Sequence, residues 1–351
     1  MNAKDALSLF EGTYRGTATL RAGYSFLLPR GDKERVLRER GWTLFHFESA
    51  SSAEFRGVEK GEREFWKEGK KYILRRLLTP LGQITELSVI DPTYGSRWVK
   101  EFFVKEPGDY KILMYALENT FFYPVFDTLR ISEENLGEDG LVFVHVERSP
   151  FQRLLLDLVG PERLFIDLVE RPDLVEEVLA LLGKKSEEEY AIAASSPLRV
   201  VHVWDNITED MTTPRFFEQY CLPFYQHVAE ILHQKGKLFA VHMDGKLKHL
   251  QELIGEAPID VIESFTLPGA GGNLELREAQ QKWPGKSIIA NVPAYWCFQE
   301  EEAVKRHLFS ALQGVDRSRF MFCVSEDLPP LRMWPALTSI TDILESWERE
   351  E

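Results

Sequence analysis

The stretch LFAVHMDGKLKHLQELIG, residues 238–255, decides the fold class. Four apolar residues lead directly into a His-Met-Asp-Gly sequence, and an apolar stripe at helical spacing follows between Leu247 and Ile254. A buried strand that ends in polar side chains and continues into a helix is typical of one βα unit of a parallel sheet. Residues two apart in a strand point to the same face of the sheet, so we expect the side chains of His242 and Asp244 on one face.

The same unit recurs along the chain from about residue 140 onward. Short runs rich in Val, Ile and Phe alternate there with helical patterns, and they read LVFVHVE (141–147), LRVVHVWD (198–205), IDVIESF (259–265), SIIANV (287–292) and RFMFCVS (319–325). No Gly-x-Gly-x-x-Gly or phosphate-loop motif follows any of these runs, which argues against a nucleotide-binding fold. The pattern predicts an α/β protein, a (β/α)8 TIM barrel.

The first 120 residues have a different texture, in which charged and aromatic residues are interleaved. The turn-like TPLG at 79–82 indicates short antiparallel strands or hairpins. We therefore expect residues 1–120 to form an N-terminal extension that packs on the barrel. Residues 121–351 are expected to form the main part of the barrel, and the whole chain one structural domain.

Composition limits the classes of partner. The 351 residues carry a formal net charge of −14, so nucleic acid or an anionic membrane surface is not the expected partner. No apolar run is long enough to span a bilayer, and the N-terminus lacks the pattern of a secretory leader, so we expect a cytoplasmic protein. We expect it to be a monomer or a homodimer. The three cysteines are far apart, which suggests neither a disulfide framework nor a structural zinc knuckle.

Polar side chains gather where the predicted strands end. Four acids and one imidazole are found there, namely Asp205, His242, Asp244, Glu263 and Glu326. In a parallel barrel the C-terminal ends of the strands meet at the catalytic face. Acids that converge there repel one another unless they are protonated, solvated or neutralised by a cation, and a metal ion is an economical remedy.

These residues lie in segments that resemble the uroporphyrinogen decarboxylase superfamily. The segments are residues 202–265, TPLG at 79–82, WVKEFFVKEPGDY at 98–110 and SEDLPP at 325–330, so the resemblance covers most of the chain from about Thr79. It implies a (β/α)8 barrel and one of two chemistries. The first is decarboxylation of porphyrinogens without a cofactor, and the second is zinc-dependent methyl transfer to or from a corrinoid protein or coenzyme M.

The two branches differ in their motifs. The decarboxylases carry an Arg-rich N-terminal signature of the type M-R-Q-A-G-R, which holds the carboxylates of the substrate, and LLPRGDKERVLRERG (27–41) lacks its spacing. Their Gly-His-Gly-type motif is replaced here by SEDLPP. An acidic rim also suits a polycarboxylate substrate poorly, because each unpaired buried carboxylate is costly. The methyltransferase branch resembles this chain more closely.

That branch binds zinc through a His-x-Cys pair and a distant Cys. Here His242 is retained, Asp244 stands in the place of the first Cys and Glu326 in that of the second. Zinc accepts imidazole and carboxylate ligands, and three protein ligands with an open fourth position form a catalytic site. The resemblance thus implies a Zn²⁺ site at His242, Asp244 and Glu326, with Cys323 as an alternative third ligand. A metal-free polar network is the competing interpretation.

Other strand-end residues complete the predicted site. Asp205 and Glu263 are expected to be catalytic, the first because it matches an Asp of the F-D-S-W-A-G motif of the family. The residues expected to contact the substrate are Asn206, Trp204, Phe265 and Tyr295. Aromatic side chains among them suit an apolar or aromatic substrate.

The prediction is a zinc-dependent methyltransferase. It would move a methyl group between a small O-methyl or N-methyl substrate, or a thiol, and a corrinoid carried by a separate protein. Two alternatives remain open, a cofactor-free decarboxylase of a small acid or porphyrinogen-like substrate, and a non-catalytic barrel that binds a small ligand.

Overall fold

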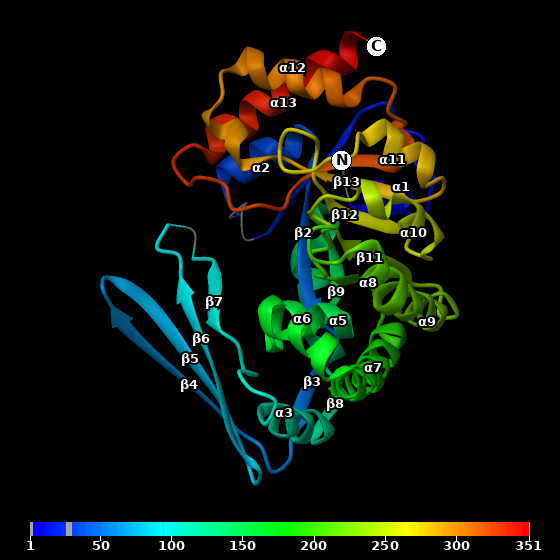
Figure 1. The fold of residues 1–351 in the computed structure, drawn as a ribbon. Coiled ribbons are helices and arrows are strands. Elements are labelled where there is room, and N and C mark those ends of the chain that lie inside the picture. The colour runs from blue at the N-terminus through cyan, green and yellow to red at the C-terminus, as the bar shows by residue number, and fades with distance from the viewer. Residues whose placement is uncertain (1–2, 26–29, 94, 351) are drawn as a thin grey trace. The chain divides into compact units, whose positions relative to one another are not determined.

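A computed structural model describes residues 3–25, 30–93 and 95–350. The chain divides into two compact units. The barrel unit comprises Met1–Ala50, Phe126–Val146 and Ala193–Glu351, and the sheet unit comprises Ser51–Val125 and Glu147–Ile192. Figure 1 labels most of the helices and strands of both units.

The barrel unit contains a closed ring of parallel strands in the order β1-β14-β13-β12-β11-β10-β9-β2. The strands are β1 (Leu20–Tyr24), β2 (Trp42–Ser49), β9 (Gly140–Val146), β10 (Val200–Val203), β11 (Leu238–His242), β12 (Val261–Phe265), β13 (Ser287–Asn291) and β14 (Phe320–Val324). Those from β9 onward fall within the six apolar runs identified in the sequence, apart from one residue at the start of β9. The predicted (β/α)8 barrel is confirmed.

Helices alternate with these strands, as a parallel sheet requires (Figure 1). They are α1 (Ala3–Phe10), α2 (Asp32–Glu39), α4 (Phe126–Leu136), α8 (Pro214–Phe216), α9 (Leu222–His233), α10 (Gln251–Glu256), α11 (Leu276–Lys282), α12 (Glu301–Leu312) and α13 (Met333–Glu350). Thr213 caps α8 by accepting a hydrogen bond from the Phe216 amide, and Pro214 occupies the first turn. After α9 the chain turns at Gly236, whose φ of 67° is left-handed.

The boundary predicted at residue 120 differs from the observed arrangement. Strands β1 and β2 lie within the first 50 residues, pair with each other, and join β14 and β9, so they complete the ring. Their sequences, LRAGY and WTLFHFES, mix polar and apolar residues, so they lack the continuous apolar run of the other barrel strands. The strands of the first 120 residues that do not belong to the ring fall in the sheet unit, which two separate stretches of chain form.

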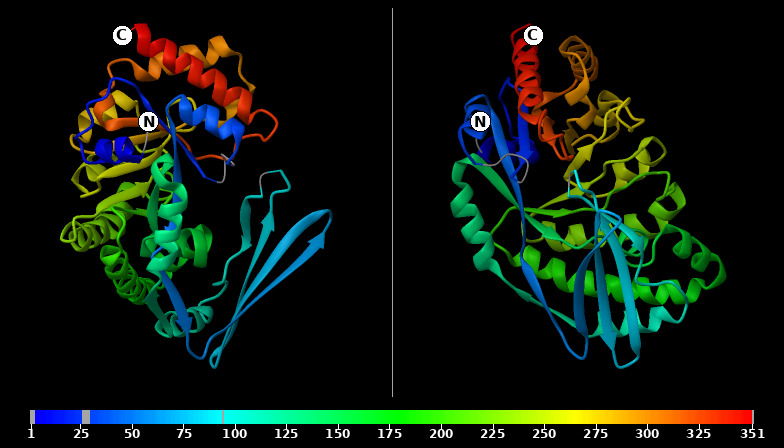
Figure 2. Two further views of the ribbon diagram at one scale, coloured as in Figure 1. Left: turned by 180° about the vertical axis from the view of Figure 1, so that it is seen from behind. Right: turned by 90° about the vertical axis from the view of Figure 1, so that its left-hand side faces the viewer.

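The sheet unit contains a four-stranded antiparallel sheet in the order β4-β5-β6-β7 (Figure 2). These strands are β4 (Glu59–Lys67), β5 (Lys70–Thr79), β6 (Gly82–Ile90) and β7 (Arg97–Glu101). Thr79 pairs with Gly82, so the predicted TPLG hairpin turn is confirmed, although β5 has 10 residues rather than a few. A second pair joins β3 (Ser51–Phe55) to β8 (Thr120–Pro124), and the unit's helices are α3 (Asp109–Glu118), α5 (Pro150–Arg153), α6 (Pro161–Glu170) and most of α7 (Pro172–Ser195).

No helix in the described residues is both long and apolar enough to cross a membrane.

A buried hydrogen bond attaches α13 to the barrel and gives a first prediction. Trp42 is 1% exposed, and its indole Nε1 donates to Thr341 Oγ1 at 2.9 Å. The variant Thr341→Val keeps the side-chain shape but leaves this donor unsatisfied, so the free energy of unfolding should fall by about 1–3 kcal/mol. Denaturant titration measures it. Thr338→Val, at an exposed position of the same helix, should change it by less than about 0.5 kcal/mol. Equal effects of the two variants would contradict this role.

Candidate active site

Three buried side chains meet inside the barrel near the C-terminal ends of neighbouring strands. His202 comes from β10, His242 ends β11, and Glu263 lies on β12 directly opposite His242. His202 and Glu263 are fully buried and His242 is 5% exposed. Their potential ligand atoms all lie within 4.8 Å of one another. We call these three residues the His–Glu cluster.

Glu263 is the centre of this cluster. Its Oε2 lies 2.6 Å from His242 Nδ1 and 3.2 Å from His202 Nε2, and its Oε1 accepts a hydrogen bond of 2.6 Å from the Tyr24 hydroxyl. Strand β12 is irregular at this point, because its register with β13 shifts between Ile262 and Phe265 and Ser264 has a φ of 63°. Such an irregularity re-aims a side chain, and strained backbone of this kind concentrates at functional sites.

The charges of the cluster follow from these contacts. Burial alone would raise the pKa of Glu263, but the charge and hydrogen bond of His242, with the contact to His202, outweigh burial and lower that pKa. Burial would likewise lower the pKa of His242, yet the Glu263 and Asp244 carboxylates outweigh it and raise the pKa to about 10. Burial lowers the pKa of His202 and raises that of Tyr24 well above its usual value. In the metal-free protein, Glu263 and His242 therefore form an ion pair, while His202 and Tyr24 are neutral.

The other ring nitrogen of His242 faces Asp244. His242 Nε2 lies 3.4 Å from Asp244 Oδ2, and the Asp244 side chain is 40% exposed. Asn206 Nδ2 donates to the same Oδ2 at 3.1 Å, from a residue whose φ of 48° is left-handed. Burial would raise the pKa of Asp244, but His242 and Asn206 outweigh it and lower that pKa. Asp244 is thus an ionised, partly accessible carboxylate held in place by an amide.

This geometry distinguishes possible metal ligands from residues that support them. Two donors on one tetrahedral zinc, at about 2.0–2.1 Å from it, lie roughly 3.3–3.4 Å from each other. The His242–Asp244 pair, at 3.4 Å, fits that separation. The 2.6 Å between His242 Nδ1 and Glu263 Oε2 is a hydrogen-bond distance instead, too short for two ligands of one ion. Glu263 thus matches the carboxylate that orients a zinc-binding histidine through its second nitrogen.

Glu326 and Cys323 were the two candidates for a third ligand. The Glu326 carboxylate accepts hydrogen bonds from Asn291 Nδ2 and, at 2.8 Å, from the Ala294 amide. Burial raises its pKa, and the negative charge of Asp244 adds to that effect. Glu326 is not among the closely grouped ligand atoms of the described residues. Cys323 is fully buried on β14, and burial with the Glu263 charge raises the pKa of its thiol well above the usual value.

The remaining predicted residues lie in different surroundings. Asp205 is fully buried and accepts a 2.6 Å hydrogen bond from the Tyr225 hydroxyl of α9. Phe265 is 1% exposed and packs edge-on against Trp283, with ring centroids 6.1 Å apart. Tyr295 lies in a short 3-10 helix, Ala294–Phe298.

Trp204 belongs to an aromatic group beside the His–Glu cluster. Its ring centroid lies 4.6 Å from that of Phe47, 5.5 Å from that of Tyr24 and 5.1 Å from that of His242. These rings form an apolar wall next to the polar groups, the combination typical of small-molecule sites. Of the four residues predicted to contact substrate, Trp204 packs against the cluster and Asn206 binds the neighbouring Asp244.

His202 and Tyr24 were not identified from the sequence. His202 precedes Trp204 by two residues in VVHVW, so the period of a strand places both on one face. That spacing was a usable signal, but an imidazole inside an apolar run usually indicates a core residue. Tyr24 lies in the range interpreted as an extension, where a barrel strand was not expected.

Comparisons with known proteins agree with this architecture. The family model described as uroporphyrinogen decarboxylase (URO-D) matches residues 99–344. No curated protein matches the chain. Among solved structures, a methyltransferase from Methanosarcina mazei has 12% sequence identity and a TM-score of 0.50, covering 72% of each chain. A B12-independent methionine synthase from Shewanella sp. W3-18-1, in complex with selenomethionine, has 12% identity and a TM-score of 0.48, covering 89% of this chain and 85% of that one.

At 12% identity, the likeness to the methyltransferase from Methanosarcina mazei concerns the fold alone. The family model, in contrast, spans well over half of the 351 residues. The chain therefore belongs to the uroporphyrinogen decarboxylase family.

Proposed function

We propose that this protein is a zinc-dependent methyltransferase that moves a methyl group between a small O-methyl or N-methyl substrate, or a thiol, and a corrinoid carried by a separate protein. The observation that carries the proposal is the His242–Asp244 pair, whose facing Nε2 and Oδ2 atoms are 3.4 Å apart while Glu263 holds the other side of the imidazole. The similarity of the fold to that of a methyltransferase supports it.

In this proposal His242 and Asp244 hold the zinc, and Glu326 would complete the ligand set by giving up its hydrogen bonds to Asn291 and Ala294. A bound zinc ion supplies Lewis acidity, which polarises the heteroatom that carries the methyl group or stabilises a thiolate. Glu263 acts as a positioning residue, because its contact with His242 Nδ1 fixes the tautomer and leaves the Nε2 lone pair free to bind. Asn206 positions Asp244 in the same way.

The aromatic group has a second task. Trp204, with Tyr24 and Phe47, presents an apolar surface beside His242. This surface excludes water from the reacting heteroatom and can pack against the body of an apolar or aromatic substrate. We propose Asp205 as a further acid at the end of β10, held by Tyr225.

Decarboxylation of a small acid is the second candidate, and one observation favours it. Without metal, the raised pKa of His242 keeps this imidazole protonated at neutral pH. A buried imidazolium at a barrel mouth can pair with a substrate carboxylate and deliver a proton to the carbon that loses CO₂. The neighbouring carboxylates Glu263 and Asp244 already neutralise this charge, which weakens that candidate.

One experiment separates the two candidates. The purified protein, with zinc and after chelation, is incubated with reduced corrinoid and a panel of methoxylated aromatics and methylated amines, and methylcobalamin absorbance is followed. We expect methyl transfer that disappears on chelation and returns with zinc. Release of CO₂ from a panel of small acids by the chelated protein, with no methyl transfer under any condition, would contradict the proposal.

The hydrogen bond from the Asn206 side chain to Asp244 gives a prediction about zinc affinity. The variant Asn206→Gly removes the hydrogen bond to Asp244 Oδ2 and keeps a residue that tolerates the left-handed φ. Loss of such a supporting contact typically weakens metal binding by about 10–100-fold, so we expect the zinc dissociation constant to rise about tenfold. Competition with a chelator of known affinity measures it. An unchanged dissociation constant would remove Asn206 from the site.

A further inference from the structure

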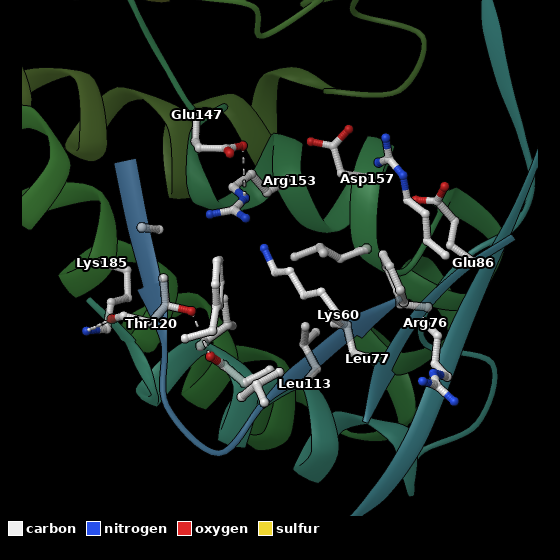
Figure 3. A pocket seen from close by; sticks show the side chains of 18 of the residues that line it. Lys60, Arg76, Leu77, Glu86, Leu113, Thr120, Glu147, Arg153, Asp157 and Lys185 are labelled. Atoms are coloured by element: carbon white, nitrogen blue, oxygen red, sulfur yellow. Dashed lines mark hydrogen bonds and ion pairs between the residues drawn. The ribbon is translucent and has the colours of Figure 1, made fainter. Parts of the chain in front are cut away.

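The sheet unit contains a cavity of its own. Its volume is about 620 Å³, within the range of roughly 300–1,000 Å³ that is usual for small-molecule sites. All the described residues that line it belong to Ser51–Val125 and Glu147–Ile192. One part of the lining is apolar and includes Leu77, Phe103 and Leu113. Figure 3 shows charged side chains from several elements around the same space.

The charged part of the lining is mainly basic. Seven Lys and Arg side chains line the described cavity against four Asp and Glu, in a chain whose net charge is −14. Several of the basic groups are matched by carboxylates: Arg75 lies 3.2 Å from Glu62, Arg97 3.1 Å from Glu86, and Arg148 3.2 Å from Asp157. Lys185 is likewise 3.0 Å from Glu188. The surplus of positive charge therefore rests on the basic side chains that have no carboxylate within hydrogen-bond distance.

Lys60 is the first of these. It lies on β4, and within the described chain no carboxylate stands at ion-pair distance from its ammonium group. Its Nζ lies 3.3 Å from the centroid of the Phe55 ring, an attraction that only partly replaces a counter-ion. In Figure 3 the side chain extends into the middle of the cavity. Lys60 is an exposed residue, and the partial burial of its ammonium group lowers its pKa, with Arg153 and Arg75 adding to this effect and Glu147 opposing it.

Arg153 is the second. It ends α5 and faces Lys60 across the cavity (Figure 3). Its nearest carboxylate oxygen, on Glu147, is 3.9 Å from Nε, which is too far for a hydrogen bond. The Nε atom is buried and has no hydrogen-bond partner among the described residues. A buried guanidinium nitrogen without an acceptor is unfavourable, so the cavity offers two cations that an anion would complete.

We propose that this cavity binds a small organic acid, with the carboxylate between Lys60 and Arg153 and an apolar body against Leu77, Phe103 and Leu113. A carboxylate accepts hydrogen bonds from both cations and neutralises the surplus charge. The apolar wall gains from contact with a hydrocarbon or aromatic body rather than with water. Both parts of the ligand are required, because a simple inorganic anion leaves most of the cavity unfilled. This site is independent of the proposed methyl transfer.

The test uses three probes of one shape. Isothermal titration calorimetry of the full-length protein compares 2-naphthoate, the neutral 2-naphthalenemethanol and the cationic 2-naphthylmethylamine, with inorganic phosphate as an anion without an apolar body. We expect 2-naphthoate to bind at least about tenfold more tightly than each of the other three, since a charge-assisted hydrogen bond contributes about 1.5–3 kcal/mol. Equal binding of naphthoate and the alcohol, or of naphthoate and phosphate, would overturn the proposal.

Two variants locate the site. Lys60→Met retains an apolar stem but loses the charge, and it should weaken naphthoate binding at least about tenfold while leaving the affinity for the alcohol unchanged. Lys71→Met is the matched control, because Lys71 lies on the adjacent strand β5, pairs with Glu64 and does not line the cavity. Undiminished naphthoate binding by Lys60→Met, or equal losses in both variants, would place the site elsewhere. Circular dichroism confirms that both variants are folded.

Discussion

The Asp244→Ala variant is expected to lose its zinc and its methyl transfer while keeping its fold. Removal of one anionic ligand of three should lower the metal content after dialysis from about one ion per chain to near zero, with the activity falling more than about a hundredfold. The fold should survive, because Asp244 is 40% exposed and lies after the end of β11 rather than in the core. Atomic absorption gives the metal content, and circular dichroism the fold.

Two further variants sharpen this result. Asp210→Ala removes an exposed carboxylate that pairs with Lys246, and it should change neither metal content nor activity. Asp244→Cys supplies a thiolate in the same place, so it should retain zinc and alter the rate. If the wild-type protein, reloaded with zinc, held none after dialysis, the proposed metal site would be wrong.

The Glu263→Ala variant is expected to show the largest loss of stability. Glu263 is fully buried and contacts His242, His202 and Tyr24, so its removal leaves a buried imidazolium and a buried hydroxyl without their acceptor. Removing one partner of a buried ion pair typically costs about 3–5 kcal/mol, and we expect the free energy of unfolding at pH 7 to fall by about that amount. Glu256→Ala, at an exposed position, should change it by less than about 0.5 kcal/mol.

The difference in unfolding free energy between the wild type and Glu263→Ala should depend on pH in a definite direction. The folded-state pKa of Glu263 is lowered below the ordinary value of 4.5, so its contribution to stability is present above that pH and is lost as the pH falls. The difference in stability between the wild type and Glu263→Ala should therefore shrink in acid. Denaturant titrations at neutral and acidic pH measure it for the metal-free proteins. A difference that stays constant, or grows, in acid would contradict the lowered pKa.

The sequence predicted the barrel strands that are buried on both faces. RFMFCVS and SIIANV are such strands, and the structure places β14 and β13 within them. Strands β1 and β2 were not predicted as barrel strands, because Arg21, Thr43 and other polar residues interrupt their apolar pattern. Arg21 is 2% exposed and pairs with Glu348 of α13 at 2.8 Å, a partner more than 300 residues away that no local pattern reveals.

The sequence predicted several residues of the candidate site, but it did not predict which of them contact one another. The His-x-Asp spacing predicted that His242 and Asp244 face the same side, and their side chains do lie 3.4 Å apart, although Asp244 follows the end of β11. The contacts of Glu263 depend instead on strand pairing, because the register of β11 and β12 sets it opposite His242 and its carboxylate reaches both histidines. Its part as a partner of His242, and the inclusion of His202, therefore follow from tertiary structure.

The closure of the barrel also determines when this protein can fold during its synthesis. Strand β1 pairs with β14, so Leu20 must wait for Met321 before it gains its neighbour. Contacts so distant in sequence form slowly, and a ribosome-bound chain that has not reached Phe320 leaves β1 and β13 as open sheet edges. Unpaired edges invite association with other chains, so truncated or slowly translated forms should depend on chaperones far more than the completed protein does.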